Sequence, residues 1–310
     1  MAFLKAFGSY LPARVVGNDE IGALAGSSAD WIYNISGIEE RRFASDEETV
    51  ADMAVCAAKD CLERAAVDAA SLGMVLVSSG SSERQFPGPA STVASRLGLD
   101  TTPALDLPIA SAGALFGMSI ASRLVEAHGN VLVVAAEKMS SIVLREPMNR
   151  TTAVLFGDGA GACLLTPKQG VAEVVDSALY TDGSFKEDLC LDFGRPLEMN
   201  GRTVILQASR KIPRAIAGLL EKHGRAASDV DTFLMHQANQ NLIVRVAEAL
   251  QVGPEKFYSN IRRRGNTSSA SMLIAAAEWE RSCGFRPGGA VMFATFGAGF
   301  HWGALLTVGC

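Results

Sequence analysis

The chain carries a similar glycine-rich pattern twice, once in the middle and once near its end. Phe156-Gly-Asp-Gly-Ala-Gly161 leads into Ala162-Cys-Leu-Leu-Thr166, and Phe296-Gly-Ala-Gly-Phe300 leads into Ala304-Leu-Leu-Thr307. A pattern that returns in the same order within one chain is typical of two fused copies of one structural unit. Chance similarity between glycine-rich loops is the alternative, and the glycines alone do not exclude it.

The segments before these motifs repeat as well. The apolar run Leu72–Ser78 is echoed by Val230–His236, and the helical stretch after Ser111 is echoed by the one after Asn266. Each of these helical stretches is followed by a strand-like run of similar length. We therefore predict two similar halves, residues 1–168 and 169–310, which meet near residues 166–172.

Strand-like and helix-like segments alternate along both halves. The buried strands that we expect are Val75–Ser78, Ala104–Leu107, Val131–Ala136, Thr152–Leu155, Thr232–Met235 and Ala290–Thr295. The stretches with helical periodicity are Thr49–Ala66, Ala112–Ala127, Leu206–Lys222, Asn241–Leu250 and Ser268–Ser282. This alternation predicts an α/β protein built in layers.

Composition narrows the class of protein. The 310 residues are 48% hydrophobic, which is enough for a large core, and the net charge of −5 gives no general reason to expect nucleic-acid binding. No run of 18 apolar residues occurs, and the N-terminus lacks a long apolar segment with a cleavage site. We expect a cytoplasmic protein that neither binds nucleic acid nor spans a membrane.

The six cysteines are scattered and form no CxxC pair, and none has zinc-ligand spacing beside a histidine. No nucleotide-type glycine fingerprint follows the first strand. We therefore expect reduced, mostly structural thiols and no metal or redox cofactor.

Ser111 is the first residue that could do chemistry, because it follows the predicted strand Ala104–Leu107 and precedes an alanine-rich helix. A nucleophile at that place would lie beside unpaired backbone N–H groups and the positive end of the helix dipole. Serine is also a favoured helix N-cap, and this segment alone favours the cap.

His236 is the best placed of the four histidines. It leaves a buried strand and enters the polar turn Gln-Ala-Asn239, which suits acid–base or hydrogen-bond work. The other candidates, His128 and His223, precede glycines near helix ends, where capping explains them. A structural role for His236 remains the alternative.

Two further loops complete the set of candidates. Gly265-Asn266-Thr-Ser-Ser-Ala-Ser271 reads on its own as a turn followed by capping residues. The closely spaced glycines of Phe296-Gly-Ala-Gly-Phe300 let backbone approach a ligand and present N–H donors, although tight strand packing explains them equally well.

Taken together, these segments resemble the β-ketoacyl-acyl carrier protein synthase III family, and the matches run in order from Tyr10 to Gly303. The motifs that carry the resemblance are Trp31-Ile, Gly37-Ile-Glu-Glu-Arg-Arg42, Phe156-Gly-Asp-Gly-Ala-Gly161, His236-Gln-Ala-Asn239, Gly265-Asn266-Thr-Ser268 and the glycine-rich loop at Phe296.

The resemblance implies the thiolase fold, five layers in the order α-β-α-β-α, built from two duplicated halves. It implies an acyltransferase that loads an acyl group from acyl-CoA onto residue 111 and condenses it with a malonyl thioester, with loss of carbon dioxide, to a β-ketoacyl product. It also implies a homodimer in which Phe86 reaches the partner's acyl tunnel, and no cofactor beyond the acyl-CoA substrate.

The resemblance assigns a role to each matched position. Residue 111 is the nucleophile, His236 and Asn266 bind the thioester carbonyl of the malonyl unit, and the N–H groups of Ser111 and Ala298 form the oxyanion hole. The residues matched to CoA binding are Trp31, Arg150, Gly201 and Asn239. Arg150 could also be an ordinary surface arginine.

The nucleophile position departs from the family, because it holds serine where the family has cysteine. A thiolate is readily populated at a helix N-terminus, whereas a hydroxyl needs a base, for which His236 is the candidate. An acyl-serine is an ordinary ester and less electrophilic toward a carbanion than a thioester. Carbon–carbon bond formation should therefore suffer more than simple acyl transfer.

Three interpretations of Ser111 stay open at this point. The chain could be a Cys→Ser variant that holds substrate without turnover. It could be a natural serine enzyme that transfers acyl groups or primes a secondary-metabolite pathway with a starter unit. It could also be a catalytically silent, acyl-binding partner subunit, although the intact His236 and Asn266 argue against that.

Other departures concern the partners. Gln240, Asn241 and Glu248 stand where the family often has basic residues that dock an acidic carrier protein. Ile35 and Glu39 replace basic residues near Trp31. Arg245 and the run Arg262-Arg263-Arg264 could form a different basic patch, but we favour a solvated loop for that run.

Overall fold

Ten strands form one continuous sheet in a computed structural model that describes residues 1–310. Their order across the sheet is β12-β11-β13-β14-β8-β1-β7-β6-β4-β5. The strands are β1 (Phe3–Tyr10), β4 (Leu72–Ser78), β5 (Ala104–Leu107), β6 (Asn130–Lys138), β7 (Asp158–Thr166), β8 (Ala172–Thr181), β11 (Val230–Met235), β12 (Phe257–Tyr258), β13 (Ala290–Gly297) and β14 (His301–Gly309).

The two halves of this sheet have the same topology. In the first, β1 pairs antiparallel with β7, β7 antiparallel with β6, and β6 parallel with β4, which is parallel to β5. In the second, β8, β14, β13, β11 and β12 pair in the same sequence and with the same directions. Within the sheet, the two halves are joined by the pairs of Phe3 with Glu173 and of Leu4 with Ala172. The prediction of a duplicated α/β fold is therefore confirmed.

The connection between the halves runs from Thr166, the last residue of β7, to Ala172, the first of β8. A division of the chain at residue 168 falls within this connection, and that domain boundary stays our proposal.

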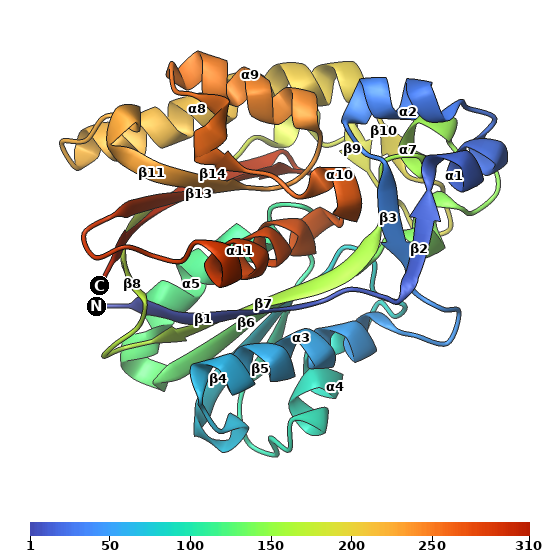
Figure 1. The fold of residues 1–310 in the computed structure, drawn as a ribbon. Coiled ribbons are helices and arrows are strands. Elements are labelled where there is room, and N and C mark those ends of the chain that lie inside the picture. The colour runs from blue at the N-terminus through green and yellow to red at the C-terminus, as the bar shows by residue number, and fades with distance from the viewer.

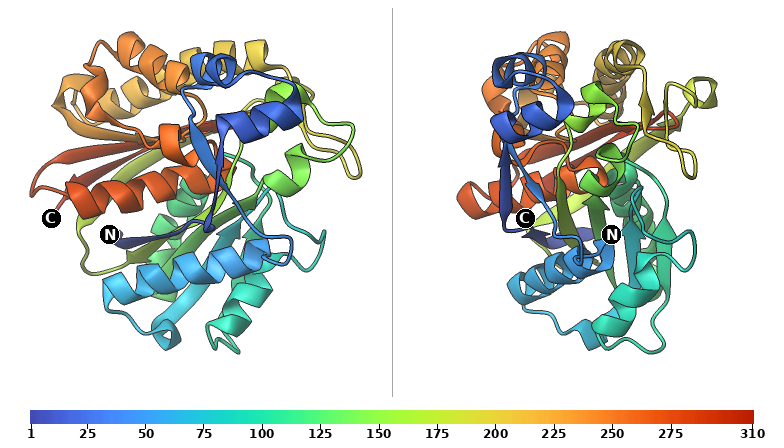
Figure 2. Two further views of the ribbon diagram at one scale, coloured as in Figure 1. Left: turned by 45° about the vertical axis from the view of Figure 1, so that its right-hand side comes forward. Right: turned by 90° about the vertical axis from the view of Figure 1, so that its right-hand side faces the viewer.

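Helices pack in three layers, below, between and above the two halves of the sheet (Figure 1). α3 and α4 cover the outer face of the first half, α5 and α11 lie in the middle, and α8 and α9 cover the outer face of the second (Figures 1 and 2). These helices are α3 (Val50–Ala65), α4 (Pro89–Arg96), α5 (Gly113–His128), α8 (Gly201–Lys222), α9 (Gln240–Leu250) and α11 (Ser271–Ser282).

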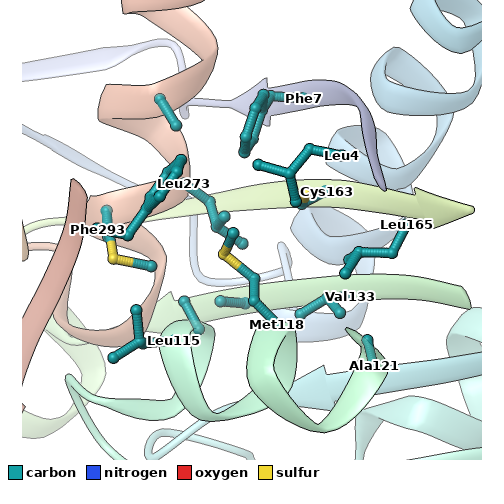
Figure 3. Packing of buried hydrophobic residues seen from close by; sticks show 14 of the residues in the cluster. Leu4, Phe7, Leu115, Met118, Ala121, Val133, Cys163, Leu165, Leu273 and Phe293 are labelled. Atoms are coloured by element: carbon teal, nitrogen blue, oxygen red, sulfur yellow. The ribbon is translucent and has the colours of Figure 1, made fainter. Parts of the chain in front are cut away.

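The middle layer holds the largest core (Figure 3). Leu115 and Met118 of α5 and Leu273 of α11 pack there against Val133 and Phe293, all essentially inaccessible to water. Full burial of each large apolar side chain contributes about 2 kcal/mol. The core therefore fixes the ends of α5 and α11 relative to both halves of the sheet.

Small elements gather at one end of the molecule (Figure 1). They are β2 (Arg14–Gly17), α1 (Asn18–Ala25), α2 (Ala29–Ser36), β3 (Glu40–Phe43), α6 (Ser140–Val143), α7 (Arg150–Ala153), β9 (Leu189–Cys190), β10 (Glu198–Met199) and α10 (Ile261–Arg264). The fully buried Arg41 joins several of them, because its guanidinium donates to Asn18 Oδ1 at 2.9 Å and to the Val154 carbonyl at 2.7 Å.

The other predicted strands lie within strands of the structure, but the strand predicted at Thr152–Leu155 is wrong. Residues 150–153 form α7, which begins where the Asn149 side chain accepts a hydrogen bond from the Thr151 N–H at 3.0 Å. A short apolar run does not distinguish a buried strand from a buried helical turn. The strand begins at Asp158, so the glycines that follow lie within β7 rather than before it.

The predicted helices all exist, with shifted ends. α8 begins at Gly201, five residues before the predicted start at Leu206, because Asn200 caps it. The stretch from Ser268 begins with a short 3₁₀ turn, and α11 proper starts at Ser271. None of the helices combines the length and the apolar character needed to cross a bilayer.

Candidate active site

Ser111 lies in the tight turn between β5 and α5, and it has a φ of +61°. The alternative that Ser111 caps the helix is wrong, since the N-cap is Ala112 and no side chain caps this helix. An L-residue in the left-handed region is strained unless its surroundings fix it. Contacts with neighbouring residues therefore hold Ser111 in a backbone conformation that serine does not favour by itself.

Those neighbours come from the second half of the chain. Thr295 of β13 donates from Oγ1 to the carbonyl of Ser111 at 3.1 Å. A Cβ at Gly297 would lie 2.9 Å from the Cβ of Ser111, so only glycine fits at the end of β13. The repeated glycine motif thus serves close packing against the candidate nucleophile.

The Ser111 hydroxyl forms no hydrogen bond within the protein, and the residue is 8% exposed. Its backbone N–H donates to Ser268 Oγ at 3.1 Å. The hydroxyl therefore lies near the N-terminus of the 16-residue helix α5, and its oxygen is free to react.

His236 follows β11, and its N–H donates to the Ala294 carbonyl of β13 at 2.9 Å. Its Nδ1 lies 2.6 Å from Ser271 Oγ, and that oxygen also accepts from the Gln237 N–H at 3.0 Å. If the single hydrogen of the Ser271 hydroxyl points to Nδ1, the imidazole carries its own hydrogen on Nε2.

Burial lowers the pKa of His236 to about 4, from an ordinary value of 6.5. No acidic side chain pairs with the ring to oppose this effect. The imidazole is therefore neutral at pH 7 and a weak base, and it can donate a hydrogen bond from Nε2.

Asn266 lies between Gly265 and the serine-rich turn, where its backbone pairs with Leu155 and Gly157 at 3.0 Å each. Its side-chain Oδ1 accepts from the Ser268 N–H at 2.9 Å. The acceptor atom of this amide is thus occupied, and its NH₂ group remains a donor.

One short segment, residues 266–271, brings the three candidates together. Ser268 contacts both Ser111 and Asn266, and Ser271 contacts His236. Three stretches that are far apart in the sequence therefore meet where β13, the turn before α5 and the start of α11 adjoin. The structure thus links Ser111, His236 and Asn266 through this segment, while their action on one substrate and their chemical roles stay proposals.

A buried carboxylate fixes the segment from behind. Glu137 of β6 is inaccessible to water and accepts hydrogen bonds from Ser269 Oγ at 2.6 Å, Ser81 Oγ at 2.5 Å and the Gly80 N–H at 3.0 Å. Charge-assisted bonds of this kind are stronger than neutral ones. Glu137 thereby ties the first half of the chain to the turn at residue 269.

Of the four residues matched to CoA binding, Trp31 and Arg150 lie on the small elements, and Gly201 and Asn239 lie at the starts of α8 and α9. The Arg150 guanidinium lies 5.7 Å from the centre of the Trp31 ring, and its Nε donates to Ser27 Oγ at 2.8 Å. Asn239 caps α9 and also donates to the Ile35 carbonyl at 2.7 Å. Gly201 is the first residue of α8, where an added Cβ would meet only the Met199 methyl group, at 3.9 Å.

Two other predicted positions lie in loops. Ala298 is in the turn between β13 and β14, and its N–H forms no hydrogen bond. Phe86 is 83% exposed in the loop between β4 and α4.

The arginine run is not the solvated loop that we favoured. Residues 261–264 form α10, in which Arg262 pairs with Glu39 at 2.5 Å and Arg264 pairs with Glu278 at 2.8 Å. The sequence analysis noted Glu39 as an acidic residue where the family has a basic one. In the structure, Glu39 is the ion-pair partner of Arg262. Only Arg263 of the three has no acidic partner.

Sequence reasoning gave no role of their own to four residues that shape the site, although the first three lie in candidate loops: Ser268, Ser271, Gly297 and Thr295. The run Thr-Ser-Ser-Ala-Ser271 was a usable signal, because so many hydroxyl groups beside Asn266 exceed what one helix cap needs. Nothing in the sequence distinguishes Thr295 from any other strand threonine.

Thr267 offers a test of the packing of this segment. Its Oγ1 is buried and has no hydrogen-bond partner, which costs stability. We expect Thr267→Val, which replaces the hydroxyl by a methyl group, to raise the free energy of unfolding by about 1 kcal/mol. Chemical denaturation measures it. An unchanged or lower stability would show that the hydroxyl is satisfied in solution.

Comparison with known proteins places this geometry in a family. The model of the 3-oxoacyl-[acyl-carrier-protein] synthase III family matches residues 105–183, and the model of its C-terminal part matches residues 220–308. The β-ketoacyl-[acyl-carrier-protein] synthase III of Nitratidesulfovibrio vulgaris is 36% identical over 98% of both chains. The chain belongs to the 3-oxoacyl-[acyl-carrier-protein] synthase III family.

Solved structures of this family agree. The synthase III of Aquifex aeolicus superposes with a TM-score of 0.95 at 33% identity, covering 99% of this chain and all of that one. The priming β-ketosynthase of the R1128 polyketide pathway superposes with a TM-score of 0.92 at 30% identity, covering 100% of this chain and 96% of that one. The expected thiolase fold with duplicated halves is confirmed.

Proposed function

We propose that the protein is an acyltransferase of the ketoacyl synthase III type. It accepts an acyl group from acyl-CoA on Ser111 and condenses that group with a malonyl thioester. The observation that carries this proposal is that hydrogen bonds of Ser268 and Ser271 link the turn of Ser111, the Asn266 amide and the His236 ring to one short segment. The names of its relatives, which include synthases III and a priming ketosynthase, support the same reaction class.

In the first step, Ser111 Oγ attacks the carbonyl carbon of the acyl-CoA thioester. The negative charge that develops on the carbonyl oxygen is stabilised by backbone N–H groups, for which those of Ser111 and Ala298 are the candidates. The C–S bond then breaks, CoA leaves as its thiol with the proton from Ser111, and an acyl-serine ester remains.

In the second step, the malonyl thioester loses carbon dioxide, and its C–C bonding electrons form an enolate. His236 Nε2–H and the Asn266 amide would donate to the enolate oxygen, since Ser271 and Ser268 occupy the acceptor atoms of these two side chains. The enolate carbon attacks the acyl-serine carbonyl, and Ser111 Oγ leaves and takes up a proton. The product is a β-ketoacyl thioester.

The proposed acyl donor is a CoA thioester rather than a free acid. Trp31 and Arg150 face each other at the small elements, where a flat aromatic base and a phosphate group could both be bound. We propose no metal or redox cofactor, because neither step changes an oxidation state or needs a Lewis acid.

We propose a homodimer in the cytoplasm, with an acyl carrier protein as the second substrate's carrier. β5 is an edge strand with one unpaired side, its Leu105 is 50% exposed, and Phe86 on the neighbouring loop is 83% exposed. An exposed edge with apolar side chains is suited to pairing with a second copy. Docking of a carrier has less support, since Arg262 and Arg264 are already paired.

A second candidate is acyl transfer from Ser111 to a carrier thiol or another acceptor, without condensation. The ester that Ser111 forms favours it, because an ester is a poorer target for an enolate than the thioester that a cysteine would form. The two functions share the first step and differ in the product.

Incubation with short acyl-CoA thioesters, followed by intact-mass spectrometry, tests the first step. We expect one acyl group per chain on Ser111, and none on Ser111→Ala. Adding radiolabelled malonyl thioester then separates condensation from plain transfer by the product formed. Tight binding of acyl-CoA with no covalent adduct would identify a silent acyl-binding subunit and overturn the proposal.

A further inference from the structure

One of the two candidate oxyanion donors is already occupied. The Ser111 N–H donates to Ser268 Oγ at 3.1 Å, whereas the Ala298 N–H forms no hydrogen bond. A substrate carbonyl oxygen that binds both N–H groups must therefore take the place of the Ser268 hydroxyl at Ser111. This competition bears directly on the reaction, because oxyanion donors act where charge develops.

The Ser268 hydroxyl has unused hydrogen-bonding capacity. Its oxygen accepts from the Ser111 N–H, but its hydrogen goes to no acceptor, and the residue is 1% exposed. A buried hydroxyl normally both donates and accepts. The free hydrogen lies next to the atom that must bind the substrate oxygen.

The backbone holds Ser268 in this position against its own preference. Its φ is +47°, a region that serine adopts only under constraint, and its N–H is fixed by Asn266 Oδ1 at 2.9 Å. Asn266, Ser268 and Ser111 thus form one hydrogen-bonded chain from a candidate thioester-binding amide to the nucleophile turn.

We propose that Ser268 is a further catalytic residue, a third donor of the oxyanion hole that also closes the hole in the free enzyme. When the substrate carbonyl arrives, its oxygen replaces Ser268 Oγ at the Ser111 N–H and receives the Ser268 hydroxyl hydrogen. No bond between heavy atoms changes in this exchange. The inference rests on the proposed acylation of residue 111.

The test measures the rate of acyl-enzyme formation against acyl-CoA concentration in Ser268→Ala and Ser268→Gly. Loss of one oxyanion donor lowers the limiting rate by about 100-fold. We expect that loss in both variants, with less than about a twofold change in the half-saturating concentration, because the group acts on the transition state. Glycine suits the positive φ, so Ser268→Gly reports on a folded protein.

Ser122→Ala is the control, because it removes a partly buried serine hydroxyl outside the segment 266–271, one that donates to the Ser119 carbonyl at 2.8 Å. We expect it to acylate at the wild-type rate. If Ser268→Gly is folded and acylates as fast as Ser122→Ala, Ser268 is no oxyanion donor, and the proposed function stands without it.

The same variants in the Ser111→Cys protein separate the inference from the function on which it rests. The backbone N–H of residue 111 is unchanged there, and a thiol reacts more readily than a hydroxyl. Failure of both the serine and the cysteine protein to acylate overturns the proposed function and the inference together. Acylation of either one, with no loss in Ser268→Gly, overturns the inference alone.

Discussion

Ser111→Cys is expected to raise β-ketoacyl product formation on the order of 10-fold or more, the gain of an intrinsically stronger nucleophile. At the start of a 16-residue helix, the thiol of a cysteine is partly ionised, whereas the serine hydroxyl is not. The acyl-thioester that forms is also a better target for an enolate than an ester. A radiolabelled malonyl assay with saturating acyl-CoA measures the product.

Ser111→Ala is the matched control for this gain, because it keeps a small side chain at the same turn. We expect no acylation and no condensation from it. If the cysteine protein becomes acylated but makes no more β-ketoacyl product than the serine protein, the nucleophile does not limit condensation. Other residues of the site, rather than the serine, would then limit the enzyme to acyl transfer.

His236→Ala in the Ser111→Cys protein is expected to lower condensation by about 100-fold, the usual effect of removing one hydrogen bond to a developing oxyanion. Acylation of residue 111 should change far less, because the cysteine thiolate needs no base. Intact mass follows the first step and the radiolabelled product follows the second. Equal losses in both steps would mean that His236 serves the nucleophile rather than the malonyl unit.

The pH dependence gives an independent reading of His236. Since burial lowers its pKa to about 4, condensation should not vary with His236 ionisation between about pH 5 and pH 8. The unfolded chain takes up a proton below pH 6.5, while the folded chain does so only near 4. Stability from this group is therefore complete above pH 6.5 and is lost as the pH falls toward 4.

Denaturation at pH 7 and pH 5 tests this linkage without any substrate. We expect the wild-type protein to lose more stability between these pH values than His236→Ala, which has no buried imidazole to protonate. An equal loss in both proteins would mean that the imidazole is accessible to water and that its pKa is close to the ordinary value.

The sequence was sufficient for the architecture because the repeat constrains topology. Two echoed sets of strands and helices leave few ways to pair, and β4–α5–β6 and β11–α11–β13 occupy equivalent places in the two halves. The sequence failed at Thr152–Leu155, where four apolar and β-branched residues fit a strand. Two of these residues lie in the helix α7 instead, because the Asn149 side chain caps its start and the tertiary surroundings favour a helical turn.

Only the part of the site that local sequence motifs mark could be predicted. His236 and Asn266 follow strand and turn signals, but their side-chain directions depend on Ser271 and Ser268, whose hydrogen bonds link residues far apart in the sequence. The ion pair of Glu39 with Arg262 could not be predicted for the same reason. The two residues are 223 positions apart, and no local sequence pattern reveals such a pair. Long-range contacts of this kind follow from packing rather than from composition.

The left-handed turn at residue 111 narrows what evolution or an engineer can place there. A positive φ disfavours β-branched side chains such as threonine, and the end of β13 approaches the Cβ of residue 111 so closely that only glycine fits at position 297. Serine and cysteine both fit, and they differ by one atom. The scaffold can therefore exchange oxygen chemistry for sulfur chemistry by a single replacement, with every surrounding contact left as it is.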